Sequence, residues 1–204
     1  MKKYKINWEE QWALHAPGYH DGYAHIDLSH YGVVEPLLLT AGAGFGDLSH
    51  PTTRLALELI PPYIKEKNIF DIGCGSGILA LAALKMGARA AYGTDIDAPS
   101  IQHANKNAAL NKLQDKSHFF NPSESPIFPK NLVGVMNMIS SEQKIAWNFH
   151  SHLYPHFSIM ITTGILKSEH TDYLDLTSSW GWSLMQEKEE KEWKAYIFKM
   201  EHTK

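Results

Sequence analysis

The sequence of 204 residues is poor in cysteine and contains only Cys74. An intrachain disulfide therefore cannot form, and a reducing, cytoplasmic compartment is the expected location. Long apolar runs are also missing. No stretch approaches the ~18 consecutive apolar residues that a membrane-spanning helix requires, so we expect no membrane segment. The basic start Met1-Lys2-Lys3 is not followed by an apolar stretch, so we expect no signal peptide.

An excess of charge of one sign is absent, because 19 Lys and Arg residues face 22 Asp and Glu residues, for a net charge of −3. This balance gives no clear nucleic-acid signal. A metal-ligand pattern is missing too. His15, His20, His25 and His30 recur every five residues, which fits neither a helix face nor strand alternation. We interpret them as surface and loop histidines and expect no metal site.

Residues 69–84 (IFDIGCGSGILALAAL) organise the rest of the chain. An apolar run, three glycines at alternate positions (Gly73, Gly75 and Gly77) and a helical apolar pattern predict a strand, a tight turn and a helix. Glycine lets the backbone turn sharply and lets a ligand approach, while the first N–H groups of the helix lack partners. The pattern predicts a seat for a nucleotide-type cofactor. A plain strand-to-helix turn is the alternative, since a glycine-rich turn alone is a weak signal.

An acidic residue follows the next predicted strand. Asp95 lies 22 residues after Gly73, close to the spacing at which a dinucleotide-binding unit places an acid for the ribose hydroxyls. A carboxylate offers acceptors for two hydroxyl donors, so we predict that Asp95 binds a ribose. A helix cap is the alternative role. Asp97, just before Ala98-Pro99, is the better candidate for that cap.

Strand and helix patterns alternate for more than one hundred residues and predict an α/β fold with a doubly wound, Rossmann-like, seven-stranded, mostly parallel sheet. Two closing strands joined by a charged turn at 187–192 predict an antiparallel C-terminal hairpin. Gly73, Asp95 and Asn137 all follow predicted strands, so they should meet in one crevice at the carboxyl edge. The predicted strands are 68–72, 90–95, 118–120, 132–136, 157–163, 182–187 and 193–199, and the helices are 77–86, 99–111, 142–153 and 169–178.

Residues 1–40 differ from the rest in being rich in aromatics and histidines, and we expect an N-terminal arm with a helix over 7–14 and a strand near 33–39 in otherwise irregular chain. The domain proper is expected to span 41–204. It opens with a glycine-rich loop that leads into a helix with Pro51 in its first turn, which should end at Pro61.

Other nucleotide-binding classes fit less well. A dehydrogenase would place its third glycine three residues after the second, where this sequence has Ile78. A P-loop is excluded because no glycine-lysine-serine/threonine triplet follows.

The pattern Asp71-x-Gly73-x-Gly75-x-Gly77, followed by an acid after the second strand, resembles the S-adenosylmethionine (AdoMet) seat of class I methyltransferases. The likeness is closest to the PrmA family, which methylates large-subunit ribosomal protein eleven. Further segments are similar to that family in the same order: Trp8 to Trp12, which resembles the linker between its two domains, Phe45-Gly46, His50-Pro51-Thr52-Thr53, Gly93-Thr94-Asp95-Ile96-Asp97, Asn137, Gly164-Ile165-Leu166 and the tail from Glu189 to Trp193.

The resemblance implies AdoMet as cofactor, S-adenosylhomocysteine as product, and methyl transfer to a protein amine, either lysine or an N-terminal amine, with a ribosomal protein among the acceptors. Asn137 is the expected catalytic residue, because its carbonyl can accept a hydrogen bond from the amine or from the ammonium group of the cofactor. The implied cofactor-binding residues are Thr53, Asp71, Gly73, Gly75, Gly77, Asp95, Ile96 and Asn137.

The sequence departs from the family on the substrate side. Asp47-Leu48-Ser49 replaces threonine-glycine-threonine, and residues 138–142 (MISSE) replace isoleucine-leucine-alanine-glycine-proline. The family's separate N-terminal recognition domain is expected to be missing. A small-molecule methyltransferase and a catalytically silent AdoMet-binding protein are therefore the alternatives. Asp47, His50 or water could take the proton released by the amine.

Overall fold

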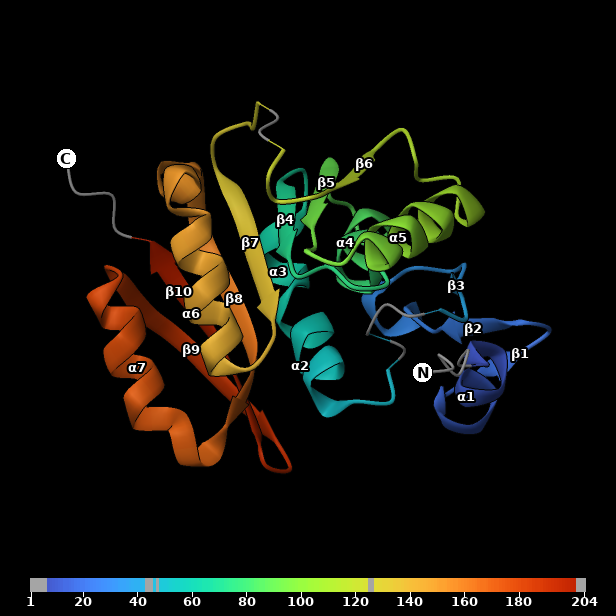
Figure 1. Ribbon diagram of the computed structural model, residues 1–204, viewed down its shortest axis with the longest axis horizontal. Coiled ribbons are helices and arrows are strands. Elements are labelled where there is room, and N and C mark those ends of the chain that lie inside the picture. Colours follow the sequence, from blue (N-terminus) through green and yellow to red (C-terminus); the bar gives the residue numbers. More distant parts are fainter. Residues whose placement is uncertain (1–6, 43–45, 47, 125–126, 201–204) are drawn as a thin grey trace, which may run out of the picture.

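The computed structural model describes residues 7–42, 46, 48–124 and 127–200. Its centre is a seven-stranded sheet with the order β6-β5-β4-β7-β8-β10-β9 (Figure 1). Strands β4 to β8 are parallel to one another, and β10 is antiparallel to both β8 and β9. This confirms the predicted fold. The strands are β4 (Asn68–Ile72), β5 (Ala90–Thr94), β6 (Ser117–Phe120), β7 (Leu132–Asn137), β8 (Phe157–Leu166), β9 (Trp182–Glu190) and β10 (Trp193–Met200).

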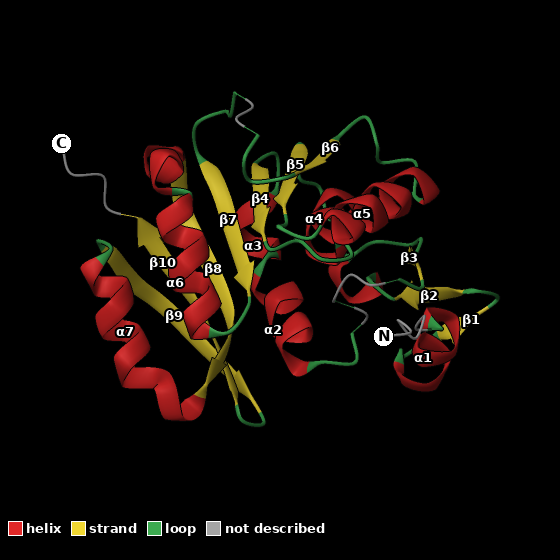
Figure 2. Ribbon diagram, in the orientation of Figure 1, coloured by secondary structure: helices red, strands yellow, loops and turns green. Residues whose placement is uncertain are grey.

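Helices cover both faces of this sheet (Figure 2). Because side chains alternate across a strand, Ile69 of β4 joins one apolar cluster and Phe70 joins the other. Asp71 therefore has its side chain on the same face as Ile69. The first cluster includes residues of α2 (Pro51–Leu59), α3 (Pro61–Ile64), α4 (Ile78–Lys85) and α5 (Ala98–Leu110). The second includes residues of α6 (Ser140–Phe149) and α7 (His170–Ser179).

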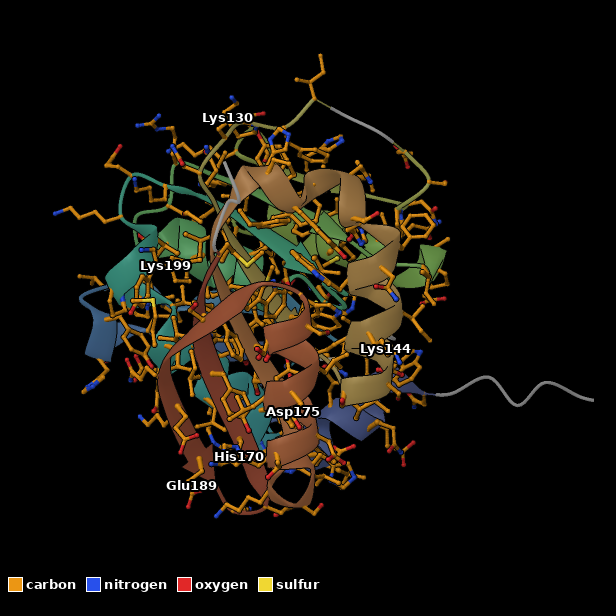
Figure 3. All side chains as sticks on the ribbon, turned by 90° about the vertical axis from the view of Figure 1, so that its left-hand side faces the viewer. Lys130, Lys144, His170, Asp175, Glu189 and Lys199 are labelled. Carbon is orange, nitrogen blue, oxygen red and sulfur yellow. The ribbon has the colours of Figure 1, made fainter. Side chains whose placement is uncertain are left out.

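The second face is rich in aromatic side chains. Trp147 of α6 is fully buried, stacks on Tyr154 at 3.9 Å between ring centroids, and meets Trp182 edge-on at 4.7 Å. Figure 3 looks at this side of the molecule, with Lys144 on α6 and Asp175 on α7. Large buried rings make this side of the sheet a rigid support for α6, whose N-terminus reaches the carboxyl edge of the strands.

The expected helix boundaries are close to the observed ones, and several caps explain them. His50 caps α2, with Pro51 in its first turn, and Asp97 caps α5 by accepting from the Ser100 N–H at 3.1 Å. The helix expected over 142–153 is shorter than predicted. It ends at Phe149, and a 3₁₀ segment, η2 (Ser151–His156), with Pro155 inside, follows.

The helix expected over 7–14 and the strand expected near 33–39 are present, but the expectation that the rest of the N-terminal arm is irregular is wrong. After α1 (Trp8–His15) the chain forms a three-stranded antiparallel sheet of β1 (Tyr19–His20), β2 (Tyr23–Ile26) and β3 (Leu37–Thr40), with the 3₁₀ turn η1 (Ser29–Tyr31) between the last two strands. The missed signal is Asp21-Gly22, which joins β1 and β2 with positive φ at both residues (54° and 82°). An Asp-Gly pair with this geometry is a preferred hairpin turn.

The arm is attached to the rest of the domain through α5, next to the glycine loop (Figure 1). The buried Asn107 accepts hydrogen bonds from the N–H and hydroxyl of Thr40, both at 2.9 Å, and donates to the carbonyl of Ser76 at 2.9 Å. One turn later, Asn111 donates to the Leu38 carbonyl and accepts from its N–H. Asn107 therefore connects β3 directly to the glycine loop.

The charged run 187–192 is largely exposed, as expected, but most of it is strand and not turn. Strand β9 continues to Glu190, so the turn is confined to Lys191 and Glu192. The charges are matched by neighbours, because Arg54 of α2 pairs with Glu190, and Lys167 pairs with Glu189 at 2.8 Å. Figure 3 shows Glu189 near the end of this hairpin. Tertiary pairing thus extends a strand that local composition predicts as a turn.

Among the histidines of the arm, His30 meets the ring of Tyr31 edge-on, with centroids 5.5 Å apart. His20 and His25 stack with centroids 3.7 Å apart, and His20 also contacts Asp21. Within 7–42, 46, 48–124 and 127–200, no three His, Cys, Asp or Glu side chains converge as metal ligands. In the same residues, no helix has the length and apolar character to cross a membrane.

Candidate active site

The carboxyl ends of the parallel strands are level with one another and border one cavity. Ile72 of β4 pairs with Thr94 of β5 and with Met136 of β7, and Asn137 pairs with Thr163 of β8. The cavity has a volume of about 830 Å³ and is lined mainly by apolar side chains. That size is within the range of small-molecule and cofactor sites. Of the residues predicted for the site, those in its wall are Gly73, Gly75, Asp95, Ile96 and Asn137.

The glycine loop lies between β4 and α4. The N–H groups of Gly73 and Cys74 both donate to the Thr94 carbonyl, at 2.8 and 2.9 Å, which ties the loop to β5. Gly73 has φ +78°, and a Cβ there would lie 2.6 Å from the sulfur of Met138. Only glycine fits this turn and leaves the cavity open beside it.

Gly77 has a different place from the other two glycines. It is the N-cap of α4 with φ +81°, and it is absent from the cavity wall. A Cβ at Gly77 would lie 3.1 Å from both Ala104 of α5 and Phe119 of β6. Its position therefore permits close packing of the loop against α5.

Asp95 stands at the end of β5 and faces the loop. One carboxylate oxygen accepts from the Gly75 N–H at 3.0 Å, and the other accepts from the Asp97 N–H at 2.9 Å. Since a carboxylate has about four acceptor sites, two remain for further donors. The next residue, Ile96, is 87% exposed and lines the same cavity.

Asp71 lies beneath the loop, outside the cavity wall. Its carboxylate is 1% exposed, and no described residue forms a hydrogen bond of ordinary geometry with either oxygen. Burial raises the pKa of Asp71 to about 7, while the Ala80 N–H in α4 partly opposes this rise and the negative charge of Asp95 adds to it. A buried carboxylate of this kind is sensitive to any positive charge placed near the loop.

Asn137 ends β7 and reaches across to α2. Its amide nitrogen donates to the hydroxyl of Thr53 at 3.3 Å. Thr53 is fully buried and is not part of the cavity wall, so it acts on the site through Asn137. With the nitrogen directed to Thr53, the carbonyl oxygen of Asn137 is the atom left to accept from a ligand.

These residues lie in a chain that matches known proteins. The family model described as ribosomal protein L11 methyltransferase (PrmA) matches residues 33–201. The chain belongs to the PrmA family. The ribosomal protein L11 methyltransferase of Tolumonas auensis is 34% identical over 158 residues, which are 77% of this chain and 54% of that protein. The enzyme of the same name from Haemophilus influenzae strain PittEE is 38% identical over 134 residues, covering 65% and 45%.

One solved structure agrees with the PrmA assignment, and a more distant one shares the fold. The crystal structure of ribosomal protein L11 methylase from Lactobacillus delbrueckii subsp. bulgaricus has a TM-score of 0.68 and 27% identity, with 80% of this chain and 84% of that chain covered. TrmK of M. capricolum, solved with S-adenosyl-homocysteine, has a TM-score of 0.57 at 15% identity over 72% and 70% of the two chains, which shows a shared fold. This chain spans about half the length of the curated PrmA relatives.

Several cavity residues were missed or weakly indicated by sequence, and some lie where the chain departs from the PrmA pattern. Met138, Ile139 and Glu142 form the wall after Asn137. Glu142 is exposed, and its carboxylate has no hydrogen bond or ion pair with a described side chain. Its place in the segment 138–142, which follows Asn137, was a usable signal. Trp193 belongs to the family-like tail 189–193, but its place in the cavity was not predicted, because it reaches the cavity from the distant hairpin.

Two histidines also line the cavity. His50, the cap of α2, pairs with the Thr52 hydroxyl at 2.8 Å, and its ring meets Trp193 edge-on at 5.0 Å. His150 is buried and bonds the Ala146 carbonyl at 2.7 Å. Burial lowers the pKa of His150, so its ring is neutral at pH 7. Of the two side chains predicted as proton acceptors, His50 lines the cavity, and Asp47 lies outside the described residues.

Proposed function

We propose that this chain is an AdoMet-dependent N-methyltransferase that acts on an amine of a protein. The observation that carries the proposal is the convergence of Gly73, Asp95 and Asn137 on one cavity of about 830 Å³ in a chain of the PrmA family. The three strand ends supply a turn without side-chain atoms at Gly73, a carboxylate with two free acceptor sites at Asp95 and an amide carbonyl at Asn137. Together these suit a cationic nucleoside with a sugar and an adjacent nucleophile.

Each predicted cofactor residue has a role in this proposal. Gly73 and Gly75 let the amino-acid part of AdoMet lie against the loop backbone, and Asp95 binds the ribose hydroxyls. Ile96 offers an apolar surface for the adenine. The remaining residues act from behind the wall: Asp71 and Gly77 through the shape of the loop, and Thr53 through Asn137.

When bound, AdoMet supplies an activated methyl group for in-line displacement. A neutral acceptor nitrogen would take up this methyl group, S-adenosylhomocysteine would leave, and the nitrogen would then release one proton. Because the sulfonium charge disappears, the protein chiefly has to align the partners and exclude water. The Asn137 carbonyl orients the amine by accepting its N–H. Glu142 and His50 line the same cavity and are two described groups that could receive the proton, with water as the alternative.

The proposed acceptor is a lysine or N-terminal amine of a protein, with ribosomal protein L11 as the first candidate because the relatives carry that name. A ribosomal acceptor would place the reaction in the cytoplasm. A small-molecule acceptor is the second candidate. It is favoured by the different wall of Met138, Ile139 and Glu142 on the side next to Asn137.

Tritiated AdoMet separates these possibilities. Purified protein is incubated with the label and either recombinant ribosomal protein L11 or a lysate, and the products are separated by size. Label in the L11 band supports the first acceptor, and label in another protein band supports a different protein acceptor. Label in the small-molecule fraction supports the second candidate. Tight AdoMet binding with no transfer in any fraction would overturn the enzymatic proposal in favour of a silent binding protein.

A further inference from the structure

The side chain of Gln143 is buried in α6, just behind the wall of the cavity. It is 0% exposed and does not line the cavity itself. Its amide nitrogen donates to the carbonyls of Met138 at 2.7 Å and Thr163 at 2.9 Å, while its carbonyl accepts from the hydroxyl of Tyr173 at 2.6 Å. Both amide hydrogens and the amide oxygen thus have partners, as a buried amide requires.

The two carbonyls bound by Gln143 belong to the strand ends that carry the site. Met138 directly follows Asn137, and Thr163 is the residue that pairs with Asn137 across the β7–β8 ladder. The backbones are closely packed there. Gly164 has φ +93°, and any Cβ at this position would collide with the Met138 carbonyl. A shift of either strand end would therefore move Asn137.

A second set of hydrogen bonds connects Asn137 and its partner strand to α2. The hydroxyl of Thr163 donates to the Thr52 carbonyl at 3.0 Å, and the neighbouring Thr53 accepts from the Asn137 amide. Asn137 is consequently held from α2 on one side and from α6 on the other. Gln143 is the side chain that joins β7, β8 and α6 in this arrangement.

Tyr173 of α7 fixes the direction of the Gln143 amide. It is 1% exposed, and burial raises the pKa of its hydroxyl far above the usual value, so the proton is retained. The donated hydrogen bond defines which end of the Gln143 amide is the oxygen, and so directs both N–H donors to the strand ends. Without it, the amide can rotate and lose one of those contacts.

We propose that Gln143 and Tyr173 are positioning residues for methyl transfer, which keep the Asn137 carbonyl at the distance and angle that the acceptor nitrogen needs. This inference rests on the proposed function. Neither side chain touches the cavity, so their effect should fall on turnover and spare cofactor affinity. The network joins residues 30 positions apart, Gln143 and Tyr173, and no motif of the sequence indicates it.

The test compares Tyr173→Phe and Gln143→Leu with a matched control, Tyr154→Phe. Tyr154 also donates its hydroxyl to a carbonyl of α6, that of Trp147 at 3.0 Å, but lies away from the strand ends. We expect kcat with ribosomal protein L11 to fall about 5- to 20-fold in Tyr173→Phe and about 10- to 100-fold in Gln143→Leu, since small misplacements are costly in a displacement reaction. The Kd for AdoMet should change less than about twofold, and Tyr154→Phe should leave kcat within about twofold.

A fall in kcat no larger than that of Tyr154→Phe at equal melting temperature would overturn the proposal, as would a parallel loss of AdoMet affinity. If Gln143→Leu fails to fold, Tyr173→Phe carries the test. If the wild-type protein methylates no acceptor, the proposed function fails, and positioning is then read from NMR. The side-chain amide signals of Asn137 should shift in Tyr173→Phe and stay in place in Tyr154→Phe. Unshifted signals in both would refute it.

Discussion

Replacing Asp95 by asparagine tests the proposed cofactor site most directly. In the free protein both oxygens of Asp95 accept a backbone N–H, from Gly75 at 3.0 Å and from Asp97 at 2.9 Å. Alanine would remove these bonds together with any ribose contact and would confuse loop structure with binding. Asparagine keeps the side-chain shape, one oxygen acceptor and one of the two backbone hydrogen bonds, so it perturbs the loop less than alanine while it removes the charge.

The size of the effect follows from the acceptor count. Two acceptor sites of the carboxylate are used by the backbone, and two remain for the ribose hydroxyls. In asparagine one oxygen becomes an NH₂ group, which cannot accept, and the other bond loses its charge assistance. Hydrogen bonds to a charged group contribute about 1.5–3 kcal/mol, so AdoMet affinity should fall about 10- to 150-fold.

Calorimetric titration with AdoMet measures this loss, and Asp97→Asn is the matched control. Asp97 carries the same charge two residues away and caps α5 through Ser100. Asparagine caps a helix nearly as well as aspartate, so this variant should fold and bind with Kd within about twofold of wild type. Unchanged affinity in Asp95→Asn would refute the ribose assignment. Equal losses in both variants would show a general electrostatic effect and no specific contact.

Three further predictions concern the loop and the strand ends. Asn137→Ala should lower kcat at least about tenfold while changing the AdoMet Kd less than about threefold, and an equal loss in both would make Asn137 a cofactor anchor only. Burial raises the pKa of Asp71 from 3.8 to about 7, so its carboxylate destabilises the folded state increasingly as pH rises through this interval. Asp71→Asn removes that penalty, and urea unfolding should show the variant gaining about 2–3 kcal/mol relative to wild type between pH 5 and pH 8, whereas a constant difference would contradict the assigned pKa. Gly77→Ala should cost about 1–3 kcal/mol more in urea unfolding than Gly87→Ala, because both have positive φ but a Cβ at Gly87 meets nothing within 4 Å, and equal costs would exclude the packing role.

The sequence predicted the parallel part of the fold well because its signals are local. The strand over 68–72 agrees with β4 at both ends, since an apolar run stops at a glycine that must turn. The Asp97 cap was likewise readable from Pro99 and its position. The alternation of strands and helices then placed Gly73, Asp95 and Asn137 at the carboxyl edge of one parallel sheet, and the structure brings all three to one cavity.

The rest depended on contacts between distant residues. The strand through Glu190 is stabilised by charges from α2, such as Arg54, which composition alone cannot pair with it. The Gln143–Tyr173 bond and the entry of Trp193 into the cavity are equally non-local. The arm is a different case, because the Asp21-Gly22 hairpin signal was present in the sequence and was overlooked.

Asn107 couples the stability of the arm to that of the glycine loop. Its amide binds Thr40 in β3 and Ser76 beside the cofactor seat, so loosening either end weakens the hold on the other. Because this coupling acts in both directions, we expect a ligand that stiffens the loop to slow hydrogen exchange in the arm as well. Hydrogen exchange of the β3 amides should therefore report whether a ligand is bound at the glycine loop, on the other side of α5.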